Sequence, residues 1–144
     1  MEGSYDSTPV GLKEIILSYN KGIGLPGCRA LHTTFRSCLS LLNLDLGGCD
    51  IGTLGAIKIC AAIGATNPPC SLLKLSLWGN HIDSRGGLEL GKALARNTQL
   101  RELKVGWNAL GSIGAKAIAD GLLNGEQNNA RFDQSKVHGT KRMN

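Results

Sequence analysis

Aromatic residues, long apolar runs and dense basic clusters are all scarce in this 144-residue chain. Only six residues are Phe, Tyr or Trp, and no apolar run reaches the ~18 residues that a membrane span needs. The net charge is +5, but no run of basic residues is longer than the pair Lys141-Arg142. The basic, aromatic-rich footprint of a nucleic-acid binder is therefore missing, and we expect neither a nucleic acid nor a membrane as partner.

The chain also lacks the sequence features of a secreted protein and of an enzyme with a catalytic triad or a metal site. Its N-terminus has no basic start followed by an apolar segment, and its five cysteines include no C-x-x-C pair. Reduced thiols in the cytoplasm, with the nucleus as the alternative, are predicted. His32, His81 and His138 share no spacing with cysteine or acidic residues that would form a catalytic triad or a metal site. We expect no catalytic residues, no metal and no cofactor.

What the chain has in excess is glycine, with 20 residues, and a pattern that recurs four times. The segment LLKLSLWGNHI at 72–82 aligns with LRELKVGWNAL at 100–110, and the same template fits 41–51 and 12–20. The shared reading is L-x-x-L-x-L/V-x-x-N, with successive shifts of 29, 31 and 28 residues. Its second column holds Ile15, Leu44, Leu75 and Leu103, and its fourth, the asparagine column, holds Asn20, Cys49, Asn80 and Asn108.

The second half of each unit predicts a helix. Each template is followed by a glycine and then by two apolar residues four positions apart, such as Ile59 and Ile63, which places both on one helical face. Asp83 or Ser84 is the expected N-cap of the third helix. A strand, a turn and a helix therefore make up each unit, and the units must stack to bury their apolar faces. The predicted units span 12–40, 41–71, 72–99 and 100–125.

The two ends of the chain break the pattern. A fifth unit in the same register would place Asn128, Arg131 and Asp133 at leucine positions, so we predict a polar, disordered tail over 126–144. Residues 1–11 are predicted to be flexible and too short for a cap. Because an uncapped solenoid exposes apolar surface and a strand edge, self-association through the open ends and a truncated fragment of a longer protein are both hypotheses.

These repeats resemble the leucine-rich repeat, and the 28- to 31-residue period with G-x-x-x-I/L in the helical half is similar to its ribonuclease-inhibitor subtype. The resemblance covers about residues 10–125. It implies an α/β solenoid, a short curved array with parallel strands on the concave face and helices on the convex face. Members of this family mostly bind proteins through the concave face, and some NOD-like receptors use such arrays for sensing. The Ran GTPase-activating protein is a member that regulates a small GTPase, which provides an alternative function.

The strand residues that point away from the helices are the predicted partner-binding surface, because side chains alternate along a strand. Tryptophan beside lysine and glutamate is typical of interaction hot spots. The predicted contact residues are Asp45, Lys74, Trp78, Glu102, Lys104 and Trp107. The leading hypothesis is thus a non-catalytic module that binds a protein partner of unknown identity.

One competing motif is a glycine pattern that resembles a dinucleotide-binding fingerprint. Gly22, Gly24 and Gly27 follow a predicted strand, and Asp45 lies 18 residues beyond Gly27. Four residues separate the strand from the first glycine, and Asp45 lies between two template leucines. The same unit architecture recurs where the glycines are missing, so the repeat explains this segment and nucleotide binding is not expected.

Overall fold

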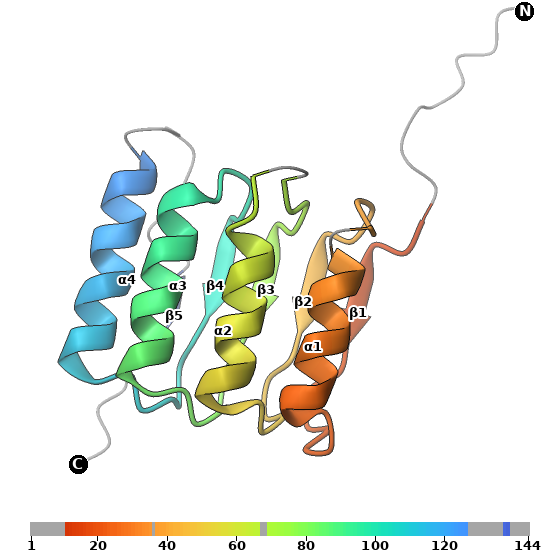
Figure 1. Ribbon diagram of the computed structural model, residues 1–144, viewed down its shortest axis with the longest axis horizontal. Helices are drawn as coiled ribbons and strands as arrows, with labels where there is room; N and C mark the ends of the chain where they lie inside the picture. The colour runs from red at the N-terminus through yellow and green to blue at the C-terminus, as the bar shows by residue number, and fades with distance from the viewer. Residues whose placement is uncertain (1–10, 36, 67–68, 127–136, 139–144) are drawn as a thin grey trace, which may run out of the picture.

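The computed structural model describes residues 11–35, 37–66, 69–126 and 137–138. Its strands lie side by side in the order β1-β2-β3-β4-β5, all parallel, and four helices form a second layer over one face of the sheet (Figure 1). Each predicted unit contributes one strand and one helix, so the predicted α/β solenoid is confirmed. The elements are β1 (Glu14–Ile16), α1 (Gly24–Phe35), β2 (Asn43–Asp45), α2 (Gly52–Ile63), β3 (Lys74–Ser76), α3 (Ser84–Arg96), β4 (Glu102–Lys104), α4 (Gly111–Glu126) and β5 (Val137–His138).

The sheet register places identical template positions next to one another. Ile15 pairs with Leu44, Leu44 with Leu75, and Leu75 with Leu103. The last three leucines are buried, because they point toward the helix layer and stack on their counterparts in the next unit. Burying each such side chain stabilises the fold by about 1.5–3 kcal/mol, so one repeated leucine column builds a continuous core.

The third and fourth helices approach each other through glycines. A Cβ atom on Gly87 would lie 2.6 Å from the Cα of Gly114, and one on Gly91 would overlap the carbonyl oxygen of Ala117. A Cβ on Gly121 would in turn overlap the carbonyl of Gly91. Glycine normally weakens a helix interior, but here its missing side chain allows backbone to touch backbone.

The helix starts differ from unit to unit. Asp83 caps α3 as expected, since its carboxylate accepts hydrogen bonds from the backbone N–H groups of Arg85 at 2.9 Å and Gly86 at 3.2 Å. Ile51 stands at the corresponding place before α2 and makes no side-chain capping bond. The described ranges contain no helix that is long and apolar enough to cross a membrane.

The C-terminal segment differs from the prediction of a tail without structure. Residues 137 and 138 form the short strand β5, in which Val137 pairs with Leu103 and His138 with Lys104. This pairing lies 34 residues beyond the matching positions of β4, outside the 28- to 31-residue register in which we searched for a fifth unit. The expectations for 1–10, 127–136 and 139–144 concern residues outside the described part of the chain.

Candidate functional site

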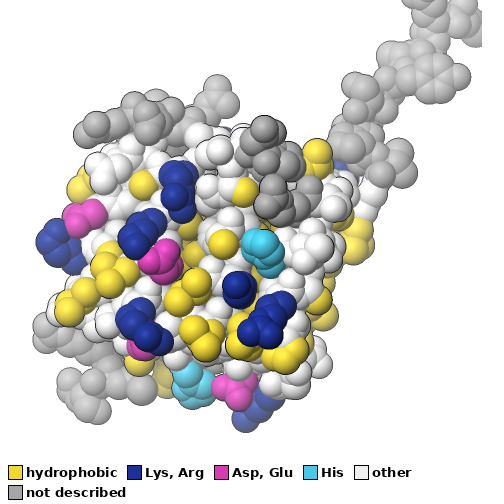
Figure 2. All heavy atoms as spheres, viewed as in Figure 1, with side chains coloured by type: hydrophobic (Ala, Val, Ile, Leu, Met, Phe, Trp, Pro, Cys, Tyr) yellow, Lys and Arg dark blue, Asp and Glu magenta, His cyan; other side chains and the backbone are white. Residues whose placement is uncertain are grey.

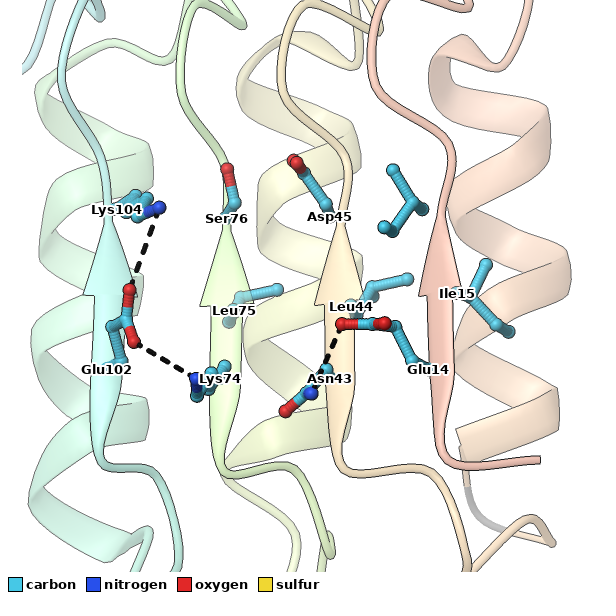
Figure 3. Close-up of a pocket in the computed structure, with 11 residues that line it drawn as sticks. Glu14, Ile15, Asn43, Leu44, Asp45, Lys74, Leu75, Ser76, Glu102 and Lys104 are labelled. Carbon is cyan, nitrogen blue, oxygen red and sulfur yellow. Dashed lines mark hydrogen bonds and ion pairs between the residues drawn. The ribbon is translucent and has the colours of Figure 1, made fainter. Parts of the chain in front are cut away.

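The face of the sheet opposite the helices carries two rows of side chains that cross all four unit strands (Figure 3). We call this surface the sheet face. Strand alternation creates it, since the residues on either side of each buried second-column residue point away from the core. Eleven residues of β1 to β4 line a shallow hollow of about 220 Å³ here. The outward members are Glu14, Ile16, Asn43, Asp45, Lys74, Ser76, Glu102 and Lys104.

Charge is unevenly distributed over the sheet face. On β3 and β4, Glu102 pairs with the Nζ of Lys74 at 3.7 Å and with that of Lys104 at 3.6 Å (Figure 3). On β1 and β2, Glu14 accepts a hydrogen bond from the amide of its neighbour Asn43 at 3.2 Å, and Asp45 accepts one from a backbone N–H. No cation pairs with these two carboxylates among the described residues. One half of the face is therefore negative and the other carries one excess positive charge.

Three aromatic rings line the end of the sheet face where the strands finish. The ring centroids of Tyr19 and Trp78 are 6.3 Å apart in an edge arrangement, and those of Trp78 and Trp107 are 6.0 Å apart. We call this set the aromatic row. Tyr19 and Trp107 are 74% and 56% exposed, whereas Trp78 between them is half-buried. Offset and edge contacts of this kind stabilise ring pairs and hold them in place.

Glycines make room for the aromatic row. Tyr19, Gly48, Gly79 and Trp107 occupy one template position, and all four have positive φ angles between 56° and 66°. A Cβ on Gly48 would lie 3.1 Å from the ring of Tyr19, so a side chain there would displace the tyrosine. Left-handed backbone costs a non-glycine residue of the order of 1 kcal/mol or more. Both large rings therefore stand at positions where the backbone itself favours glycine.

Behind the aromatic row, the asparagine column forms a ladder of hydrogen bonds between units. The Asn80 Oδ1 accepts from the backbone N–H groups of Cys49 at 3.0 Å and Ile51 at 3.3 Å. Its Nδ2 donates to the carbonyls of Leu46 at 2.7 Å and Trp78 at 3.1 Å. A buried amide can satisfy donors and acceptors at once, so each asparagine fixes the turn that positions the rings.

Asn108 repeats this arrangement one unit later. It accepts from the N–H groups of Asn80 at 2.9 Å and Ile82 at 3.0 Å and donates to the Leu77 carbonyl at 2.9 Å. Cys49 holds the same position with a thiol, whose Sγ lies 3.0 Å from the Leu17 carbonyl.

A thiol is a weaker donor than an amide, and burial raises the pKa of Cys49, which keeps it protonated. The first member of the column, Asn20, is exposed and donates only within its own unit, to the Leu17 carbonyl at 2.9 Å and the Ser18 carbonyl at 3.5 Å.

The residues predicted as contacts occupy two neighbouring areas. Four of them, Asp45, Lys74, Glu102 and Lys104, line the hollow, while the two tryptophans belong to the aromatic row. Sequence reasoning did not select Tyr19, although it precedes its column asparagine by one residue, as Trp107 does. That shared offset is the signal that would have identified it.

Outside the sheet face, the residue types that support catalysis or metal binding are dispersed. The described residues contain no group of three His, Cys, Asp or Glu side chains placed to hold a metal ion. Burial raises the pKa of Cys60 to about 12 and that of Cys28 to about 11, so these thiols are protonated and poorly nucleophilic. His81 lies 3.9 Å from Asp50, with both side chains exposed, and His32 is half-buried in α1.

The stacked units, the leucine columns and the asparagine ladder together define a leucine-rich repeat solenoid. The family model described as "Leucine Rich repeat" matches residues 37–60 and 96–119. With the relatives described below, this match shows that the chain is a leucine-rich repeat protein of the ribonuclease-inhibitor type, which confirms the resemblance seen in its sequence.

Two kinds of named protein are similar to the chain. It is 33% identical to the ribonuclease inhibitor of Sus scrofa over 104 residues, which cover 72% of this chain and 22% of that protein. It is 34% identical to NACHT, LRR and PYD domains-containing protein 12 of Mus musculus over 100 residues, covering 69% of this chain and 9% of the relative. For protein 2 of the same series from Homo sapiens, the identity is 36% over 109 residues, covering 76% of this chain and 10% of the relative. The matched region thus spans about a tenth to a fifth of these relatives.

Proposed function

We propose that the chain is a non-catalytic module that binds a protein partner through the sheet face, in the cytoplasm or the nucleus. The observation that carries this proposal is the aromatic row beside the charged hollow. Exposed tryptophan and tyrosine bury much area with few rotatable bonds, and these residue types dominate the free energy of protein interfaces. The ribonuclease inhibitors among the relatives carry a name that refers to a protein target, which supports a binding role for this chain too.

Each predicted contact residue has a distinct part in this proposal. Trp78 and Trp107 supply apolar contact area, since their rings pack on each other and need little reordering on binding. Glu102, held between two lysines, presents a mixed charge pattern that selects a partner by complementarity. Asp45 contributes a carboxylate with one oxygen engaged by the Gly47 N–H at 2.8 Å and the other available to a donor of the partner.

The experiment compares partner recovery by the wild-type chain with recovery by a Trp78→Ala/Trp107→Ala double variant, using cross-linking and quantitative mass spectrometry. A matched control removes two exposed apolar side chains elsewhere, Leu39→Ala/Leu123→Ala. We expect the tryptophan variant to lose at least about tenfold in recovery of the partner, because hot-spot truncation costs about 2 kcal/mol or more. The control should match wild type. Equal recovery by all three proteins, each shown to be folded by circular dichroism, would remove the sheet face from consideration.

A second assay tests the non-catalytic part of the proposal. Candidate small GTPases are mixed with the chain, and GTP hydrolysis is followed by phosphate release. We expect no stimulation above the intrinsic rate of each GTPase. Acceleration by the wild-type chain would replace the binding function with the GTPase-regulating alternative.

A further inference from the structure

Three helices expose apolar side chains in their N-terminal halves. Leu54 of α2, Leu88 of α3 and Ile113 of α4 are 57%, 41% and 61% exposed. Single exposed leucines are common on protein surfaces, whereas contiguous apolar patches mark surfaces that bind something. These three side chains form such a patch only if they lie close together.

The contact between α3 and α4 brings two of them together. The helices touch where a Cβ on Gly87 would lie 2.6 Å from the Cα of Gly114. Leu88 follows Gly87 in the chain, and Ile113 precedes Gly114. Both side chains therefore emerge beside the closest approach of the two helices.

A hydrogen bond joins the start of α2 to the same area. The Oγ1 of Thr53 accepts the backbone N–H of Asp83 at 2.9 Å, so the first turn of α2 lies beside the first turn of α3. Leu54 follows Thr53 in the chain, and Arg85, which is exposed, holds the corresponding position in the next unit. We call Leu54, Leu88 and Ile113 the helix patch.

Basic residues outnumber acidic ones on the helices. Six Lys or Arg and two Asp or Glu are found among the helix residues whose side chains the structure describes, and Figure 2 shows the basic side chains spread between the apolar ones on this face. The two acids, Glu89 and Asp120, are each bonded to a lysine of their own helix at 2.7 Å. Arg29, Lys58 and Arg96 have no ion-pair partner among the described residues. The described side chains of the helix layer thus carry a net charge of +4.

We propose that the helix layer docks on an anionic lipid surface, with the helix patch among the lipid headgroups and Arg29, Lys58 and Arg96 facing their negative charges. Apolar side chains beside unpaired cations are the combination that binds such surfaces. An amphipathic helix of a protein partner would instead need a groove, whereas these side chains protrude from helices that lie side by side in one layer (Figure 1).

This inference goes beyond the proposed function and uses the opposite face of the molecule. Docking through the helices leaves the sheet face free to bind a protein. It departs from the sequence-based expectation that the chain has no membrane partner. The helix patch combines residues from three units, so it produces no continuous apolar run that a hydropathy reading could detect.

The test is co-sedimentation of the whole chain with phosphatidylcholine vesicles, prepared with and without phosphatidylserine. We expect binding only when phosphatidylserine is present, and weaker binding as salt is raised. Lys58→Gln/Arg96→Gln should weaken binding at least about tenfold, and Leu54→Ser/Ile113→Ser at least about threefold.

Two control variants separate the helix patch from general properties of the chain. Lys74→Gln/Lys104→Gln removes the same net charge from the sheet face, and Leu12→Ser/Ile16→Ser removes two equally exposed apolar side chains near β1. Both should bind within about twofold of wild type. Wild-type protein that fails to bind phosphatidylserine vesicles overturns the proposal. So does an equal loss in the helix and sheet variants, because it would show attraction by net charge alone. Circular dichroism of each variant excludes loss of fold as the cause.

Discussion

The first two units and the last two units share one template but are joined in different ways. Between α1 and α2, a Cβ on Gly55 would meet the Cys28 side chain, with its Sγ at 3.1 Å. Between α3 and α4, glycines let backbone touch backbone, as at Gly91. The asparagine column also differs between the two regions. The second unit has the Cys49 thiol at this position, whereas the last two units have the fully bonded amides of Asn80 and Asn108.

Exposure separates the first unit from the other three, since the first-column Leu41 of the second unit is only 1% exposed. In the first template column, Leu12 is 59% exposed while Leu72 and Leu100 are 1% and 2% exposed. In a solenoid, stability is close to a sum of unit terms and nearest-neighbour interfaces. A shared template therefore does not give equal stability, and we expect the first unit to open before the last two. The predictions below test this difference.

The largest expected effect comes from shortening a second-column side chain, and it should differ between the first unit strand and the last. Leu103→Ala should lower the free energy of unfolding by about 3–4 kcal/mol, because it leaves a cavity in a fully buried site. Ile15→Ala, at the matching but only partly buried position of β1, should cost about 1 kcal/mol. Urea unfolding of both variants measures the difference, and equal losses would contradict the proposed inequality between units.

The next prediction concerns the contact between α3 and α4. Gly91→Ala should lower the free energy of unfolding by about 2–3 kcal/mol, since the new methyl group would overlap the Ala117 carbonyl. Without that contact, alanine would be the better helix former by about 1 kcal/mol. Gly22→Ala is the control, because a Cβ there meets nothing within 4 Å. A stabilising effect of Gly91→Ala would show that the helices lie further apart.

Exchanging the fourth-column residues between the two regions should change stability in opposite directions. Cys49→Asn gives the Leu17 carbonyl an amide donor in place of a thiol and should raise the free energy of unfolding by about 1 kcal/mol. Asn80→Cys leaves the N–H groups of Cys49 and Ile51 without their acceptor and should lower it by about 2 kcal/mol. Thermal and urea unfolding measure the stability of both variants. A lower free energy of unfolding in both would show that the hydrogen-bond ladder does not set the stability difference.

The smallest effect is expected at the capped start of α3. A hydrogen bond with Thr53, followed by the backbone N–H groups of Gly86 and Arg85, lowers the pKa of Asp83 from 3.8. A lowered pKa means that the ionised carboxylate favours the folded state, so its contribution is present above pH 3.8 and disappears as the pH falls further. Asp83→Ala should therefore lower the melting temperature slightly at neutral pH, with a smaller difference in strong acid. A difference that grows in acid would contradict the capping role.

Much of the fold could be predicted from the sequence, because each unit repeats the same local chemistry. The second column fixed both the strand positions and the residues that face the core, as Leu44 and Leu75 show. The short strand β5 was missed, since its 34-residue offset departs from the period of the other units. The contact between α3 and α4 was also missed, because a glycine in a sequence does not reveal which backbone it will meet.

The candidate site was only partly predictable. Alternation along the strands identified the outward charges, because a period of two is a local property. The pairing of Glu102 with both lysines and the place of Tyr19 beside Trp78 depend on contacts between units. The contact residues named for partner binding stay predictions until a partner is tested.

The sequence by itself determined the repeat and its stacked leucines, because these follow from a period and from the burial of apolar side chains, and its resemblance to the leucine-rich repeat indicated the class of the protein. Only the tertiary structure decided which side chains from different units meet. It joined Tyr19, Trp78 and Trp107 in one row and brought Leu88 and Ile113 beside the contact between α3 and α4. Neighbouring rings of the row are 59 and 29 positions apart in the sequence, and the two helix side chains are 25 positions apart, so sheet register and helix contacts that no single segment encodes bring them together.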